Sequence, residues 1–347
     1  MGLTTEAADA TTVTLALDDL QGIVLHGYGH LWHACFVLLG VQPGRGASAR
    51  RFVAGLPLTS ATRGARHAAE PGPFVNVAFT HAGLVAMGLP AALTDAFPRD
   101  FVEGPTTAAR ALLVGDVDDS APEGWAWGAP AGEPGGSPVH VMVLLYAASE
   151  DELEALRGRT TADADAAGLR EVLPLRTVRL PRRQEHFGFR DGISQPVVEG
   201  AGAPAREQRE HNTVKPGEIF LGHPNAFGES AYVPGGAGSF ADSGTYLVAR
   251  TLSQDVPGFW RFCRQHAGDS AGAIALASRM VGRWPSGAPI AKYDRDNPDL
   301  DDRTRNDFEY AKLDPRGVGC PFSAHIRRTN PRDWGVATTI RDSRTVV

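Results

Sequence analysis

The segment from Gly188 to Pro196 places one carboxylate between two glycines in a stretch that a proline ends. It reads Gly-Phe-Arg-Asp-Gly-Ile-Ser-Gln-Pro, so Gly188 and Gly192 bracket Asp191. Glycine permits tight turns and a close approach of the backbone to a ligand. A carboxylate held in such a loop could act as a general acid and base, whereas the ordinary interpretation is an Asp-Gly turn. The residues alone leave both interpretations open.

A second candidate for chemistry is His325. It lies among apolar and basic residues in segment 320–332, which reads Cys-Pro-Phe-Ser-Ala-His-Ile-Arg-Arg-Thr-Asn-Pro-Arg. A neutral imidazole is a good iron ligand, so this histidine could be an axial ligand of haem. The alternative is a packed or surface histidine, because the chain has eleven histidines in all.

Segment 268–272, Gly-Asp-Ser-Ala-Gly, fits the pattern of a serine nucleophile elbow at Ser270. That motif needs a strand before it and a helix after it. The residues up to His266 have helical spacing, so we expect a turn between two helices instead. The acidic run 294–302 begins like a calcium loop, but Asp299 stands where the invariant glycine belongs. We interpret that run as a solvated loop.

Composition excludes several classes of protein. A chain of 347 residues suits two domains. Its net charge is -6 and its basic residues are dispersed, so no nucleic-acid partner is expected. The longest strongly apolar run, 31–41, is too short to span a membrane. The start of the chain lacks the pattern of a secretory signal, and we therefore expect a cytoplasmic protein. The sequence is compatible with a homo-oligomer.

The three cysteines do not form any Cys-x-x-Cys pair. Neither a disulfide framework nor a zinc site is indicated. We expect Cys35, Cys263 and Cys320 to be small buried hydrophobes in a reducing compartment.

The elements that must position these residues follow from apolar spacing. After a lead-in over 1–17, a first domain over 18–180 is predicted as an antiparallel sheet with helices on one face. The helices are expected from Thr80 to Met87 and from about Ser149 to Arg157. The expected strands are Gly22–Leu25, Ala34–Leu39, Phe74–Phe79, Val139–Tyr146 and Leu173–Leu180.

A second domain is predicted over 181–347, because the composition turns basic near Pro181. A strand is expected over Tyr246–Arg250, and helical spacing extends over Asp255–His266 and Ala273–Val281. Trp284–Gly287 is expected to turn the chain.

The exact order of residues in these segments is more informative about function than the spacing of single residue types. Gly188–Pro196 resembles the G-x-x-D-G motif of dye-decolourising peroxidases, in its fuller G-F-x-D-G-I-S-Q-P form. Segment 320–332 resembles the segment that carries the proximal histidine of that family. Further similar stretches, in the same order, extend the resemblance from about residue 18 to residue 333.

The resemblance implies two ferredoxin-like α+β domains of the dimeric α/β-barrel superfamily, with a b-type haem held mainly by the second. It implies that His325 is the proximal iron ligand and that Asp191 moves the proton of hydrogen peroxide. A bulky organic electron donor, such as a dye, would be oxidised. Candidate cofactor-binding residues besides His325 are Gly192, Ile193, Ser194, Gln195 and Arg327.

The end of the chain departs from the family pattern. Family members continue to an Arg-Arg-Gly segment that supplies a distal arginine, and here neither Arg341 nor Arg344 is followed by glycine. We expect a shortened second domain, with Arg341 as the remaining candidate for the distal arginine. A haem-binding homologue without turnover is the alternative function, and a serine hydrolase built on Ser270 is a more remote one.

Overall fold

The computed structural model describes residues 15–65, 72–193, 195–202 and 213–329. The chain divides into two compact units. Unit 1 contains residues up to 178 together with 219–223 and 230–247, and unit 2 contains 179–218, 224–229 and the residues from 248 onward. The predicted domain boundaries stay a prediction, because compactness alone does not show that a part folds by itself.

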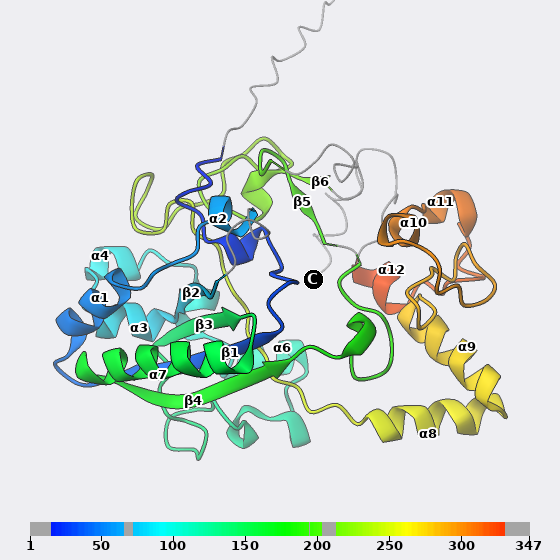
Figure 1. Ribbon diagram of the computed structural model, residues 1–347, viewed down its shortest axis with the longest axis horizontal. Helices are drawn as coiled ribbons and strands as arrows, with labels where there is room; N and C mark the ends of the chain where they lie inside the picture. The colour runs from blue at the N-terminus through cyan, green and yellow to red at the C-terminus, as the bar shows by residue number, and fades with distance from the viewer. Residues whose placement is uncertain (1–14, 66–71, 194, 203–212, 330–347) are drawn as a thin grey trace, which may run out of the picture. The chain divides into compact units, whose positions relative to one another are not determined.

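Unit 1 is built on a four-stranded sheet, drawn at the centre of Figure 1. Its strand order is β2-β3-β1-β4, and every neighbouring pair is antiparallel. Helices connect β1 to β2 and β3 to β4, which gives the ferredoxin-like βαββαβ arrangement. The strands are β1 (His33–Val41), β2 (Phe74–Phe79), β3 (Val141–Ala147) and β4 (Leu169–Val178). The predicted α+β fold is confirmed.

Side chains alternate between the two faces of the sheet, as the period of a strand requires. Cys35, Val37 and Leu39 of β1 enter a core that also contains Leu84 and Leu153. Three helices cover this face, and the longest of them, α7, runs along the sheet in Figure 1. They are α1 (Gly46–Ala54), α3 (His81–Ala86) and α7 (Glu150–Ala166).

The opposite face of the sheet packs against loops and a short 3₁₀ helix that contains Ile23. Leu38, Met142 and Leu144 form a second buried cluster with the indole of Trp127. Trp127 belongs to the Gly- and Pro-rich stretch between the 3₁₀ helix Pro122–Gly124 and β3. The helices of the main core thus lie on one face, as the sequence predicted, whereas the short helix Ala61–Ala65 contacts the other face through Arg63, 5.1 Å from the Phe74 ring.

Side-chain caps set where two of these helices begin. The Thr80 hydroxyl accepts a hydrogen bond from the Gly83 N–H at 3.0 Å, and Ser149 accepts one from Glu152 at 3.2 Å. Each satisfies an N–H of the first turn that has no partner inside the helix. Helix α7 continues nine residues beyond the predicted end at Arg157, because its apolar positions lie on the core.

Short elements complete unit 1. The strand predicted at Gly22–Leu25 is wrong, since Gly22–Val24 forms a 3₁₀ helix whose first N–H donates to Thr59 O. A run of only four apolar residues does not distinguish these structures. The other elements are α2 (Ala61–Ala65), α4 (Ala91–Thr94), α5 (Arg99–Glu103), α6 (Ala108–Val114) and the 3₁₀ helix Asp118–Ser120.

Unit 2 consists mainly of helices and ordered loops within the part of it that the structure describes. Two strands of two residues each form a parallel pair, β5 (Val197–Val198) and β6 (Thr213–Val214). The 3₁₀ helices are Pro181–Arg183 and Pro216–Glu218. The α-helices are α8 (Val256–Ala267), α9 (Ser270–Val281), α10 (Asp302–Asn306), α11 (Tyr310–Leu313) and α12 (His325–Thr329).

The sequence predicted α8 and α9 within three residues at each end, whereas the strand predicted at Tyr246–Arg250 is wrong. Residues 245–255 belong to no helix or strand, and Val248 is 83% exposed. An alternating pattern forms a strand only where a partner accepts its backbone hydrogen bonds.

Among the described residues, no helix has the length and apolar content that crossing a bilayer requires.

All three cysteines are buried and free of disulfide bonds. Cys35 lies in the main core of unit 1, and Cys263 and Cys320 lie in two separate clusters of unit 2. Burial raises the pKa of each thiol above its ordinary value, because the thiolate is poorly solvated there. The interpretation of these cysteines as small buried hydrophobes is confirmed.

Candidate functional site

The loop that carries Asp191 begins with a turn built around Glu185. Its carboxylate accepts hydrogen bonds from the N–H groups of Phe187 and Phe189, at 2.7 and 2.8 Å. Its own N–H donates to Phe189 O at 2.8 Å. Gly188 closes the turn with a φ of +93°, a value that disfavours any side chain. This turn fixes the backbone immediately before Asp191.

Asp191 lies in an Asp-Gly turn, and its role as a general acid and base stays a prediction. Its N–H donates to Arg183 O at 2.8 Å, and its Oδ1 accepts from the Gly192 N–H at 2.7 Å. Gly192 has a φ of +71°, so the segment is an Asp-Gly turn. The side chain is nevertheless exposed, and no described residue makes a hydrogen bond to Oδ2. One carboxylate oxygen is therefore free to exchange a proton.

The neighbouring Arg190 fastens the loop to helix α10. Its Nε and Nη2 donate to Asp302 Oδ1 at 3.1 and 2.9 Å, and Nη2 also reaches Oδ2 at 3.2 Å. Such paired contacts hold both planar groups in one orientation. Arg305 and Arg183 reach the same carboxylate, at 3.2 and 3.4 Å. Asp302 thus joins three arginines, although the sequence indicated a solvated loop.

A tight hairpin over residues 283–289 lies behind this loop. The Trp284 N–H donates to Ala288 O and the Gly287 N–H donates to Trp284 O, both at 2.8 Å. Arg283 is buried, and its Nη1 donates to Gly287 O and to Arg305 O, also at 2.8 Å. The predicted turn at Trp284–Gly287 is confirmed, and a buried arginine holds it.

The hairpin and the end of α9 contact the segments of both candidate residues. The Arg190 N–H donates to Pro285 O at 3.0 Å. A Cβ on Gly287 would overlap Ile193, two residues after Asp191, and a Cβ on Gly282 would overlap Ile326, next to His325. Both glycines also have φ values above +90°. The loop that carries Asp191 and the segment that carries His325 therefore both pack on segment 282–289.

His325 is the first residue of α12. Its side chain is exposed, and its imidazole makes no hydrogen bond to a described residue. Its carbonyl accepts from Thr329 Oγ1 at 3.1 Å, within the short helix. Both ring nitrogens are therefore available to a ligand or metal. The described residues hold no group of three or more His, Cys, Asp or Glu side chains that could bind a metal ion.

Arg327 lies two residues further on and is buried. Its guanidinium donates to Cys320 O at 2.6 Å and to Asp314 Oδ2 at 3.2 Å. It also lies 4.3 Å from the ring centroid of Tyr310 and 4.4 Å from that of Phe322. These contacts hold the segment before and after His325 in place. The binding of a cofactor by Arg327 itself stays a prediction.

Asp314 is the charged partner of that arginine. Burial raises the pKa of its carboxyl, but the N–H groups of Cys320, Gly319 and Val318, together with Arg327, lower it more, so the net shift is downward. The Cys320 and Val318 N–H groups each donate to this carboxylate at 2.8 Å. The loop around residues 314–320 is thus closed by an ionised aspartate.

The other candidate residues have less definite surroundings. Ile193 is half-buried and Gln195 is exposed, whereas Ser194 and Arg341 lie outside the described residues. Ser270 is the first residue of α9 and follows helix α8 across Gly268 and the cap residue Asp269. The expected turn between two helices is confirmed. No strand precedes the serine, so its geometry gives no support to a nucleophile elbow.

The sequence did not indicate the supporting roles of Asp302, Gly282 and Gly287. Gly287 follows Pro285 in a run typical of turns, which was a usable indication. Nothing near Asp302 in the sequence indicates its arginine partners, because two of them lie more than a hundred residues earlier in the chain.

Unit 2 therefore presents an imidazole and a carboxylate oxygen that have no hydrogen-bond partner among the described residues, on two segments that pack on one hairpin. The other unit is ferredoxin-like. Similar known proteins share this architecture, although no family model matches the chain. It is 31% identical to a dye-decolorizing peroxidase of Mycena epipterygia, over 95% of this chain and 62% of that protein. It is 32% identical to Peroxidase 2 of Mycetinis scorodonius, over 93% and 61%.

Solved structures agree with these relatives. A dye-decolorizing peroxidase in complex with 2,6-dimethoxyphenol superimposes with a TM-score of 0.75 at 30% identity, over 92% of this chain and 71% of that one. An ancestral D-type dye decolorizing peroxidase gives a TM-score of 0.76 at 27% identity, over 94% and 72%. The chain belongs to the dye-decolorizing peroxidase family. It spans about 60% of the length of the two curated relatives above.

Proposed function

We propose that the protein is a haem-dependent peroxidase that reduces hydrogen peroxide and oxidises a bulky organic donor, such as a dye or a phenol. One observation carries the proposal: in a chain of this family, Asp191 and His325 both present unpartnered polar atoms from segments that pack on the same support. The 2,6-dimethoxyphenol bound to one solved relative is a donor of this kind.

The residues present fit a haem. An exposed imidazole without a hydrogen-bonding partner among the described residues can ligate iron, and His325 is such a group. Gly192, Ile193 and Gln195 extend from the Asp191 turn and, with Ser194, are proposed to lie against a b-type haem. When bound, haem would supply the iron chemistry that splits the O–O bond and takes electrons from the donor.

The chain's own contribution is to position groups and to move a proton. We propose that Asp191 Oδ2 accepts the proton of hydrogen peroxide, because no backbone N–H of a described residue donates to this oxygen. The same oxygen then delivers it to the leaving oxygen, since a carboxylate between the two can serve as base and acid in turn. Arg190 and Asp302 keep this carboxylate oriented through the loop backbone.

Arg341 is proposed as the positive group near the peroxide, as in the sequence analysis. Arg327 is proposed to act on the cofactor mainly by holding the His325 segment, because its guanidinium already has Asp314 and Cys320 as partners. A cytoplasmic location and a homo-oligomeric state stay predictions. A haem-binding homologue without turnover is the competing proposal.

Reconstitution with haem tests the proposal. We expect the 347-residue chain to give a Soret band and to decolourise an anthraquinone dye only when peroxide is present. In His325→Ala, we expect loss of stable haem binding, because the proposed protein bond to iron is removed. The matched control is His223→Ala, since His223 lies in unit 1 with Nε2 3.2 Å from Ser243 Oγ. A Soret band without dye oxidation would favour the competing proposal.

A further inference from the structure

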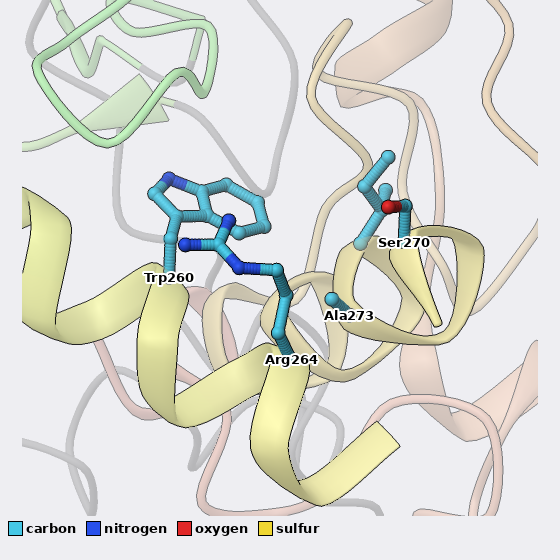
Figure 2. Close-up of a pocket in the computed structure, with 5 residues that line it drawn as sticks. Trp260, Arg264, Ser270 and Ala273 are labelled. Carbon is cyan, nitrogen blue, oxygen red and sulfur yellow. The ribbon is translucent and has the colours of Figure 1, made fainter. Parts of the chain in front are cut away.

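Helices α8 and α9 form a hairpin that holds a small open pocket. Gly268 and Asp269 connect the two helices, and both are drawn in yellow in Figure 1. The pocket has a volume of about 270 Å³. Figure 2 shows its lining, which comprises Trp260, Arg264, Ser270, Ala273 and Ile274. None of these residues belongs to the site proposed above.

The apolar part of the pocket is rigid. The indole N–H of Trp260 donates to Phe187 O at 3.2 Å, and its ring lies 5.4 Å from that of Phe259. The ring is also parallel to that of Phe189 at 6.4 Å. Ala273, on the facing helix, is buried in the same cluster. A fixed indole face beside a small side chain is a surface on which an aromatic ring can stack.

The polar part of the pocket lacks partners among the described residues. The Arg264 guanidinium makes no hydrogen bond or ion pair with any of them, and Figure 2 shows it extending toward the Trp260 ring. The same holds for the Ser270 hydroxyl, which makes no hydrogen bond to a described residue. By contrast, the nearby Arg261 lies 3.9 Å from Asp255. The pocket therefore offers an unpaired cation and a hydroxyl beside an aromatic wall.

The charges around the pocket favour an anion. Ser270 begins a twelve-residue helix, whose amino end carries a partial positive charge. No carboxylate lines the pocket, and the neighbouring Asp269 is engaged, since its Oδ1 accepts from the Gly272 N–H at 2.7 Å. A guanidinium forms its strongest pairs with carboxylates, through two parallel hydrogen bonds.

We propose that this pocket binds a small aromatic carboxylate with a single ring. The ring stacks on Trp260, and the carboxylate accepts hydrogen bonds from Arg264 and from the Ser270 hydroxyl. A volume of about 270 Å³ lies at the lower end for small-molecule sites, which excludes a bulky dye. The proposal goes beyond the peroxidase function and does not depend on it.

Titration of the 347-residue chain with sodium benzoate tests the proposal without haem or peroxide. The indole N–H signal that disappears from the NMR spectrum of Trp260→Phe identifies the reporter. We expect benzoate to shift this signal with a dissociation constant on the order of 1 mM, typical of a ligand this small in an open pocket. Arg264→Gln should weaken binding at least tenfold, and Ser270→Ala should weaken it about fivefold.

Three controls separate the contribution of the ring from that of the charge. Arg261→Gln removes a charge from the same helix outside the pocket and should leave binding unchanged. Benzyl alcohol keeps the ring without the carboxylate, acetate keeps the carboxylate without the ring, and both should bind at least tenfold more weakly than benzoate. Equal binding of either compound, no shift of the Trp260 signal by benzoate, or unchanged binding in Arg264→Gln would overturn the proposal. None of these results would affect the Soret band or dye oxidation.

Discussion

At the scale of single residues, Asp191 is held by its backbone and by only one of its two carboxylate oxygens. Asp191→Asn keeps this shape, because the amide oxygen can still accept from the Gly192 N–H. The variant should bind haem normally but react with peroxide about 10²–10⁴-fold more slowly, since an amide cannot take the proton. Stopped-flow absorption of the haem measures this rate. A rate within about twofold of wild type would make Asp191 a turn residue only.

His140 gives unit 1 a dependence on pH. Its Nδ1 accepts from the Val41 N–H at 2.8 Å, and burial lowers its pKa below the ordinary 6.5. Below pH 6.5, His140 binds a proton more readily in the unfolded chain than in the folded chain. The free energy of unfolding therefore falls as the pH falls. Above pH 6.5 this loss disappears, because both states are neutral at this histidine.

We expect His140→Gln to flatten the fall in melting temperature between pH 6.5 and lower pH, because glutamine does not titrate. His186 is exposed, so His186→Gln should keep the wild-type slope and serves as the control. Parallel pH profiles for wild type and His140→Gln would rule out this origin of the pH dependence.

At the scale of elements, the ion pair between Arg190 and Asp302 connects the loop that carries Asp191 to α10. Asp302→Asn removes the charge but keeps the shape. We expect it to slow the peroxide reaction by about tenfold to a hundredfold, because a small displacement of a catalytic group is costly. Haem retention should be unchanged.

The control for that variant is its neighbour Asp301, which caps α10 through Thr304 N–H at 2.7 Å and does not touch Arg190. Asp301→Ala should lower the melting temperature through loss of the cap. Its peroxide rate per haem should stay at the wild-type value. If both variants slow the reaction equally, α10 matters only as a folded helix.

Long apolar patterns predicted elements well, and the sequence also predicted helices that begin at Thr80 and near Ser149. The sheet of unit 1 followed from four such patterns, since each strand buries one or both faces. The short run at Gly22 and the stretch at Tyr246 failed, because their structure depends on neighbours that the local sequence does not specify. The residue order of the motifs at 188–196 and 320–332 indicated Asp191 and His325 as site residues. It did not indicate Asp302 or the hairpin at Gly287 as their supports. Those supports arise from contacts between distant segments.

At the scale of the whole molecule, the two units should respond differently to haem. A ligand stabilises only the part of a protein that binds it, by about 2.7 kcal/mol at a hundredfold excess over its dissociation constant. We therefore expect two thermal transitions, of which haem raises only that of unit 2, by roughly 5–10 °C. Differential scanning calorimetry measures this. His325→Ala should abolish the shift, and one transition that moves as a whole would contradict independent units.

The buried cysteines have a consequence for a protein that is proposed to meet peroxide. Oxidation of cysteine to sulfenic acid proceeds through the thiolate, at accessible sulfur atoms. Here burial raises the pKa of all three thiols and also removes them from solvent. Cys320 is the critical case, because it lies five residues before His325, near the Tyr310 hydroxyl in a closed cluster. The packing around the His325 segment thereby also protects the Cys320 thiol from oxidation by the peroxide that the protein is proposed to reduce.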